Sequence, residues 1–322
     1  MCDIVSRAYT HGLLGSPRPW CKEEKVKFLC PAPGYDRHFS ICQQMGMEMI
    51  TIPMLADGPD MDMVEKLAAE DASVKGIWCV PKYSNPEGKT YSDEVVRRFA
   101  SMKTAAPDFR IFWDNAYIVH HLSDDQDQLV NIFDLAKEYG TEDRVLEFCS
   151  TSKISYAGAG VGAMAASPAN IEWTKKIMTV QAIGPDKINQ LRHVRYFKDM
   201  AGIEAHMKKH AELLKPKFDM VLSMLESNLG GTGAGSWHNP KGGYFISFDA
   251  MPGCAKRIHA LCKEAGVVMT GAGATFPYGK DPQDSNLRIA PSLPPVEELQ
   301  AAAEVFCVCA LLAAVEKRLE NV

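Results

Sequence analysis

The sequence has no excess of charge of one sign and no long apolar run that stands out as a membrane span. Its 322 residues carry 35 lysines and arginines against 40 aspartates and glutamates, a formal net charge of −5. Because both signs are mixed along the chain, we expect neither a nucleic-acid-binding nor a membrane-binding surface. The N-terminus also lacks the apolar segment of a signal peptide, so we expect a cytoplasmic protein.

The ten cysteines show no Cys-x-x-Cys pair and no zinc-ligand spacing. They are scattered among apolar neighbours, which favours buried free thiols in a reducing compartment over a disulfide framework. Examples are Cys30, Cys79, Cys149 and Cys307.

Two histidine pairs are the remaining candidates for a metal site. His206 and His210 are four residues apart on an expected helix, but lysines flank them and no acidic residue adjoins them. A solvated helix face is therefore favoured over a metal site. His120 and His121 are adjacent in sequence, so they do not share one face of an element. We predict no metal.

Short apolar segments alternate with amphipathic ones through the first half of the chain. The expected strands are residues 26–30, 47–52, 76–80, 110–113, 145–149 and 162–166, and the expected helices are 1–10, 61–69, 93–102 and 132–138. This alternation predicts an α/β fold with a mostly parallel sheet sandwiched by helices. In such sheets, ligands bind at the carboxyl edge of the strands.

The second half of the chain predicts a smaller α+β domain. A helical block at 186–228 leads into the glycine-rich run 230–235, which is read as a connector because no Lys-Ser/Thr follows it to form a phosphate cradle. The expected strands that follow are 243–248, 267–270 and the segment around Arg288, and the expected helices are 254–265 and a closing helix from 296. We therefore place a large domain at 1–185 and a small domain at 186–322.

Lys153 is the residue around which a chemical interpretation can be built. It follows the expected strand 145–149 and precedes a stretch of small residues. A lysine at the mouth of a sheet is partly desolvated, which lowers its pKa and frees its amine to attack a carbonyl. Pyridoxal phosphate uses such a lysine together with an acidic partner for its pyridine nitrogen, and Asp114 ends the strand 110–113. Alone, either residue would more often be a loop lysine or a helix cap.

Three more residues fit a ligand site at the same edge. Tyr35 follows a tight turn, where its ring would stack on a planar ligand or pack on the core. Asn85 precedes a proline that holds it out of the α region, so its amide can point into a cleft. Arg288 lies in an apolar segment where an unpaired guanidinium is costly. Its planar donors suit a carboxylate, and a structural salt bridge is the alternative.

In chain order, these motifs resemble those of the class I aminotransferases, which are pyridoxal-phosphate enzymes of fold type I. The motifs are Asn85-Pro86-Glu87-Gly88, Asp114-x-Ala116-Tyr117, Ser150-x-Ser152-Lys153, Pro240-x-Gly242-Gly243-Tyr244-Phe245 and Arg288. The resemblance covers essentially the whole chain. Two further stretches, Gly184-Pro185-Asp186-Lys187 and Arg288-Ile289-Ala290-Pro291-Ser292, are most similar to a bacterial aspartate aminotransferase subgroup.

The resemblance implies a role for each motif residue. Lys153 would hold the cofactor and move a proton between the substrate Cα and the cofactor. Asp114 would keep the pyridine nitrogen protonated, and Arg288, with Asn85, would bind the substrate. The implied cofactor-binding residues are Tyr35 by stacking, Asn85 and Tyr117 at the ring oxygen, Ser150 and Ser152 at the phosphate, Asp114 and Lys153.

Two departures from the family pattern stand out. Many members carry an arginine for the phosphate shortly after the lysine, where this chain has Ala157-Gly158-Ala159-Gly160-Val161-Gly162. Without that arginine, the phosphate would rely on hydroxyls, backbone amides and a helix N-terminus. By comparison with the family, we also expect this chain to be N-terminally truncated, by roughly a hundred residues.

The implied reaction is a ping-pong transfer of an amino group from aspartate to 2-oxoglutarate in a homodimer. The distal carboxylate needs a second cation, for which Arg37, Arg192 and Arg195 are candidates. A β-lyase or decarboxylase would use the same lysine, aspartate and arginine, because the cofactor supplies the electron sink in each case. A non-catalytic relative is the alternative from another class, and the intact set of site residues argues against it.

Overall fold

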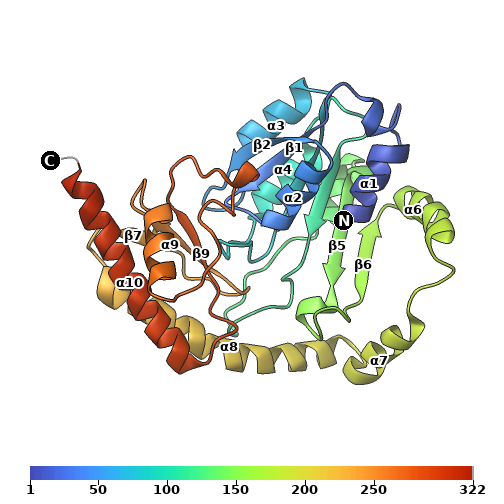
Figure 1. Ribbon diagram of the computed structural model, residues 1–322. Coiled ribbons are helices and arrows are strands. Elements are labelled where there is room, and N and C mark those ends of the chain that lie inside the picture. The colour runs from blue at the N-terminus through green and yellow to red at the C-terminus, as the bar shows by residue number, and fades with distance from the viewer. Residues whose placement is uncertain (321–322) are drawn as a thin grey trace.

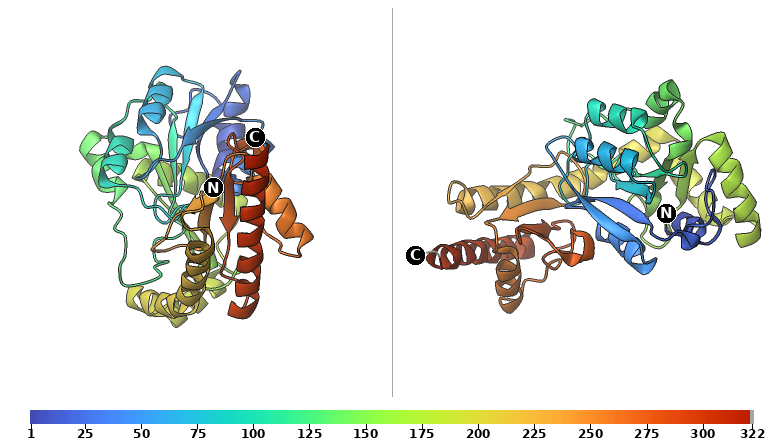
Figure 2. Two further views of the ribbon diagram at one scale, coloured as in Figure 1. Left: turned by 90° about the vertical axis from the view of Figure 1, so that its left-hand side faces the viewer. Right: turned by 90° about the horizontal axis from the view of Figure 1, so that it is seen from above.

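The structure is a computed structural model that describes residues 1–320, and it contains two sheets flanked by helices (Figures 1 and 2). The larger sheet has the strand order β2-β1-β3-β4-β5-β6. Its first five strands are parallel and β6 is antiparallel to β5. The strands are β1 (Lys27–Ala32), β2 (Glu48–Pro53), β3 (Val74–Cys79), β4 (Arg110–Asp114), β5 (Val145–Ser150) and β6 (Gly162–Ala166).

Helices cover both faces of this sheet, as the alternation of apolar segments predicts. The helices are α1 (Cys2–His11), α2 (Asp36–Gln44), α3 (Met61–Glu70), α4 (Asp93–Ser101), α5 (Ile132–Tyr139) and α6 (Pro168–Gln181). One apolar core lies under α3, α4 and α5, and another lies under α1 and α2. Asp60, Ser92 and Asn131 cap α3, α4 and α5 by accepting hydrogen bonds from backbone amides of the first turn. These caps fix where the helices begin after the loops that follow the strands.

The second sheet is antiparallel, with the order β7-β8-β9. Its strands are β7 (Gly235–Trp237), β8 (Ile246–Ala250) and β9 (Asn286–Ile289), and the helices around it are α9 (Ala255–Glu264) and α10 (Val296–Leu319). In Figure 1, α7 (Lys187–Phe197) and α8 (Met200–Leu229) run beneath both sheets, from below β6 to the second sheet. The C-terminal half of α8 packs into the core of the second sheet. Short 3₁₀ turns occur at Trp20–Lys22, Glu142–Arg144, Thr151–Lys153 and Pro277–Gly279.

Some elements differ from the sequence-based prediction for physical reasons. The helices α2 and α6 and the short strand β7 were not predicted. Of the residues in α6 only Asn170 is buried, so this helix has no apolar stripe to reveal it. The predicted strand 267–270 is wrong: the segment is irregular, and Val268 is 92% exposed. Its β-branched composition favours a strand, but no neighbouring strand pairs with it among the described residues.

The cysteines are free, as predicted, but not all of them are buried. Seven of the ten are buried, whereas Cys2, Cys21 and Cys149 are exposed. Cys149 lies on β5, whose outer neighbour β6 is itself largely exposed, so this edge of the sheet is not covered on both faces. The expectation of a buried thiol at Cys149 is therefore wrong.

The helix α10 also departs from expectation, because by length and composition alone it could cross a membrane. The prediction that no run is long enough to do so is therefore wrong. Its apolar residues pack into the core of the second sheet, where Leu299, Phe306 and Ala310 are buried against α8 and α9. We attribute the high hydropathy of α10 to this packing.

Candidate active site

The carboxyl ends of the parallel strands bring the predicted site residues to one edge of the large sheet. Tyr35 follows β1, Asn85 lies in the loop after β3, Asp114 ends β4, and Lys153 follows β5. Because β1 lies between β2 and β3, the strand order reverses direction beside β1. Loops on the two sides of such a reversal diverge and leave a crevice, which is the usual ligand site of open α/β sheets.

Asp114 is buried and held by a histidine that sequence reasoning missed. Its carboxylate is 7% exposed, and Nε2 of His38 lies 3.0 Å from Oδ2. The His38 ring stacks on Trp78 with centroids 4.5 Å apart, and the Tyr35 ring meets its edge at 5.1 Å. His38 was missed because it lies on α2, which was not predicted. Its position three residues after Tyr35, on the turn that enters the cleft, was the available signal.

Lys153 ends a 3₁₀ turn and directs its amine toward Asp114 and Tyr117. Its Nζ lies 5.0 Å from the centroid of the Tyr117 ring. Burial lowers the pKa of the Lys153 amine, and the negative charge of Asp114 opposes this effect. The lysine is therefore partly desolvated, and Asp114 supplies a negative charge that acts on its amine.

Tyr117 and Asn85 complete the same cluster. Tyr117 is 3% exposed, and burial, followed by the charge of Asp114, raises the pKa of its hydroxyl. A hydrogen bond with Asn85 acts in the opposite direction. The Tyr117 hydroxyl therefore stays protonated at neutral pH and can donate a hydrogen bond into the site.

Arg288 projects from β9 of the second sheet into the same region. Its Nη1 donates to Oδ1 of Asn85 at 3.1 Å and pairs with Oδ1 of Asp36 at 3.2 Å. The guanidinium lies 4.9 Å from the Phe245 ring, and Nη2 donates to Thr270 at 3.3 Å. Within residues 1–320, its buried Nε has no hydrogen-bond partner. One donor of the fork is therefore left for a ligand.

Ser150 and Ser152 lie together at the end of β5, beside a glycine that has no room for a side chain. Their hydroxyl oxygens are 2.8 Å apart, and the Ser152 amide donates to Oγ of Ser150 at 3.1 Å. A Cβ atom at Gly160 would lie 2.4 Å from Oγ of Ser152. A side chain at position 160 is thus sterically excluded, and the groups beside it that could donate to an anion are the hydroxyls of Ser150 and Ser152.

Comparison with known protein families shows which family the chain belongs to. The sequence model of the family described as aspartate amino-transferase matches residues 1–322. The chain belongs to this aspartate aminotransferase family. Its fold is the predicted α/β arrangement of fold type I, which agrees with the solved structures that resemble it.

Similar proteins carry aminotransferase names. An aspartate aminotransferase of Corynebacterium glutamicum is 51% identical over 316 residues, which cover 98% of this chain and 73% of that protein. A provisionally named aminotransferase of Mycolicibacterium smegmatis is 52% identical over 316 residues, which cover 98% of this chain and 74% of that protein. The crystal structure of an aspartate transaminase from Corynebacterium glutamicum matches with a TM-score of 0.97 at 50% identity, covering 98% and 74% of the two chains.

Aminotransferases of this family use pyridoxal phosphate, and the donor set at the crevice fits that group. A pyridine nitrogen can meet the buried carboxylate of Asp114, and a ring oxygen can meet Asn85 and Tyr117. The partly desolvated amine of Lys153 would be the group to react with the carbonyl carbon. The unpartnered Nε of Arg288 is an independent sign that a polar ligand belongs here.

The three arginines predicted for a distal carboxylate are placed differently. Arg37 is exposed on α2, and its charge acts on the Tyr35 hydroxyl at the mouth of the crevice. Arg192 lines a cavity together with Ser155, which lies two residues after Lys153. Arg195 is exposed on α7. Arg37 is thus near Tyr35, and Arg192 lies near the turn that carries Lys153.

Proposed function

We propose that this chain is a pyridoxal-phosphate-dependent aminotransferase that transfers an amino group from aspartate to 2-oxoglutarate by a ping-pong mechanism. The observation that carries the proposal is the amine of Lys153, which is partly buried, lies 5.0 Å from the centroid of the Tyr117 ring and is subject to the charge of Asp114. The similarity to an aspartate aminotransferase at 51% identity supports the choice of substrate.

The residues around the cofactor have separable tasks. When bound, pyridoxal phosphate supplies the electron sink that makes the substrate Cα–H acidic. Lys153 is the base that takes the Cα proton, and its lowered pKa keeps a larger fraction of the amine neutral. Asp114, oriented by His38, holds a proton on the ring nitrogen. Tyr117 donates its hydroxyl hydrogen to the ring oxygen.

Other residues orient the ligands. Arg288 binds the α-carboxylate of the amino acid, with Asn85 fixing the guanidinium in place. Tyr35 stacks on the ring. Ser150 and Ser152 donate their hydroxyl hydrogens to the phosphate.

We further propose that the chain acts as a homodimer in the cytoplasm. Apolar side chains on α6, on α7 and in the loop between them are exposed: Val180 is 89% exposed, Ile188 76% and Val194 62%. An exposed apolar strip of this kind supports an interface between two copies of the chain. The ten free cysteines of the chain fit the reducing environment of the cytoplasm. Light scattering after size-exclusion chromatography tests the oligomeric state, and a monomer at micromolar concentration would overturn that part.

The reaction is tested by absorbance spectroscopy of the purified chain with added pyridoxal phosphate, before and after aspartate. We expect a visible band that Lys153→Ala abolishes, and that aspartate removes as oxaloacetate accumulates. Formation of pyridoxamine phosphate separates transamination from β-elimination and decarboxylation. A band that aspartate leaves unchanged would refute the substrate, and the absence of any Lys153-dependent band would refute the enzyme.

A further inference from the structure

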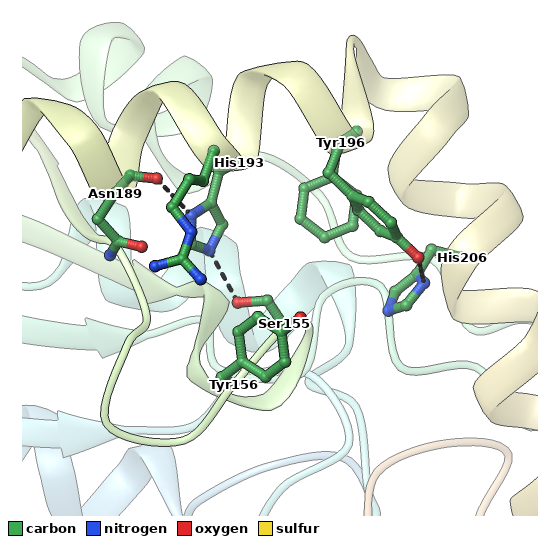
Figure 3. A pocket seen from close by; sticks show the side chains of 8 residues that line it. Ser155, Tyr156, Asn189, His193, Tyr196 and His206 are labelled. Atoms are coloured by element: carbon green, nitrogen blue, oxygen red, sulfur yellow. Dashed lines mark hydrogen bonds between the residues drawn. The ribbon is translucent and has the colours of Figure 1, made fainter.

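The turn that carries Lys153 is held by histidines from two helices outside the large sheet. His193 lies on α7 and contacts Thr151 and Ser155, on the two sides of the lysine. His206 lies on α8 and contacts Ile154, the residue after the lysine. Figure 3 shows both histidines and the bond between His193 and Ser155. We call the residues Thr151–Ser155 the lysine turn. The two histidines play no part in the chemistry described above, so their contacts need a separate explanation.

His193 binds the hydroxyl groups of the lysine turn. Its Nδ1 lies 2.8 Å from the carbonyl oxygen of Asn189 on the same helix, so Nδ1 is the donor. In the neutral ring Nε2 is then an acceptor, and the hydroxyls of Ser155 and Thr151 lie 2.8 and 3.0 Å from it. One imidazole thus ties residues two before and two after Lys153 to α7.

His206 binds the backbone of the same turn from α8. Its Nε2 donates to the carbonyl oxygen of Ile154 at 2.9 Å, and Nδ1 lies 3.4 Å from the hydroxyl of Tyr196. The prediction that His206 and His210 form a solvated helix face is therefore wrong for His206. That prediction used only the neighbours in sequence, which cannot reveal that α8 crosses beneath the lysine turn.

A cavity lies on this side of the lysine turn, beside the two histidines. Its volume is about 260 Å³, and Ser155, Tyr156, His193 and His206 are among the residues that line it (Figure 3). Close packing fixes the turn at Ile154, which is buried against Phe197 and Met207. The polar residues of the turn are held by hydrogen bonds along the rim of the cavity. On the opposite side, the hydroxyl of Tyr244 donates to the carbonyl oxygen of Lys153 at 3.0 Å.

We propose that His193 and His206 are positioning residues that hold the lysine turn against the sheet and so keep the Lys153 amine in its partly desolvated place. The inference rests on the proposed function, because it assigns a purpose to the position of the amine. Without these contacts the turn relaxes toward the cavity, and the amine gains water and loses its alignment with the substrate Cα.

The test compares variants that remove the hydrogen bonds with variants that retain them. His193→Leu and His206→Leu fill similar space without polar groups, whereas His193→Gln and His206→Gln can still donate and accept. His259→Leu, on α9, is the matched control. In the cofactor-free chain, the pH midpoint for labelling Lys153 with an amine-reactive reagent is measured by mass spectrometry. A more solvated amine titrates closer to its ordinary value, so we expect the leucine variants to shift the midpoint upward by about one pH unit.

The glutamine variants should restore the midpoint to within a few tenths of a pH unit, and the control should not move it. Ser155→Ala removes the partner of His193, so combining it with His193→Leu should add little further shift. In the loaded protein, kcat for aspartate should fall about tenfold in the leucine variants while KM changes little, since Arg288 is untouched. Far-UV circular dichroism checks that each variant is folded.

The outcomes separate the two proposals. If the wild type forms no Lys153-dependent band, the proposed function fails, while the labelling midpoints still report on the two histidines. If the wild type is active and folded leucine variants match it in midpoint and kcat, the positioning role is refuted. An equal shift in the glutamine and leucine variants would also refute it, because loss of the ring alone would then explain the effect.

Discussion

Arg288 offers the sharpest test of the substrate site, because its guanidinium has both a salt bridge and an unused donor. The substitution Arg288→Leu removes the proposed contact with the α-carboxylate of the substrate and also the ion pair with Asp36. A carboxylate receptor and a structural ion pair predict different results. The first predicts a large kinetic loss with little loss of stability, and the second predicts the reverse.

The magnitudes follow from the surroundings of the guanidinium. One hydrogen bond to a charged carboxylate contributes about 1.5 to 3 kcal/mol, so its loss lowers kcat/KM by roughly 10- to 10²-fold. The Asp36 side chain is 35% exposed and remains partly hydrated when its partner is removed. Losing that ion pair therefore costs the fold only about 1 kcal/mol or less.

Steady-state assays of oxaloacetate formation and urea unfolding measure the two quantities on the same preparations. Asp36→Asn is the matched control, since it breaks the ion pair and leaves the guanidinium in place. We expect Asp36→Asn to change kcat/KM by less than about fivefold. The receptor assignment is refuted if Asp36→Asn and Arg288→Leu reduce kcat/KM equally, or if Arg288→Leu loses stability while its kcat/KM for aspartate is unchanged.

Three further predictions concern stability and cofactor binding. Lys75→Met removes the positively charged partner, at 2.8 Å, of the fully buried carboxylate of Asp108. The free energy of unfolding should therefore fall by about 3 to 5 kcal/mol in urea titrations. An unchanged unfolding midpoint would contradict this. Gly160→Ala places a Cβ atom 2.4 Å from a serine hydroxyl oxygen, whereas at Gly162 the nearest contact is 4.0 Å. Fluorescence titration should therefore show weaker cofactor binding in Gly160→Ala and normal binding in Gly162→Ala. Burial raises the pKa of the Glu87 carboxyl group to about 7. Its contribution to stability is therefore complete below the unfolded pKa near 4.5 and is lost as pH rises through about 7. In urea titrations, Glu87→Gln should be more stable than the wild type at pH 8 but not at pH 4.5, and equal gains at both pH values would argue against a buried acid.

The catalytic cluster could be predicted from the sequence because its residues follow strands. Lys153, Asp114 and Asn85 each lie just beyond a buried apolar segment, and parallel strands bring such positions to one edge. His38 could not be predicted in the same way, because it depends on how α2 packs against Trp78. The contact of His206 with the lysine turn joins residues 52 positions apart in the chain, and no local pattern encodes it.

The secondary structure likewise divides into elements that could be predicted from the sequence and elements that could not. Elements with a buried stripe, such as α4 and β3, were predicted within a few residues. The mostly exposed helix α6 was missed, and the segment 267–270 was predicted as a strand although it pairs with none of the described strands. Apolar periodicity reports burial against a core, so it gives no information on helices that lie at the surface.

The long helix α8 contacts both the lysine turn and the core of the second sheet. It begins beside the lysine turn, which His206 contacts, and it ends in the second core, where Leu225 and Leu229 pack beside the sheet that carries Arg288. Its thirty residues span about 45 Å, so a tilt of about 5° displaces one end by roughly 4 Å. The interior Pro216 removes one backbone hydrogen bond and marks where the helix bends most easily. The helix thus contacts the lysine turn near its start and the core of the second sheet at its end, and Pro216 lies between these two contacts.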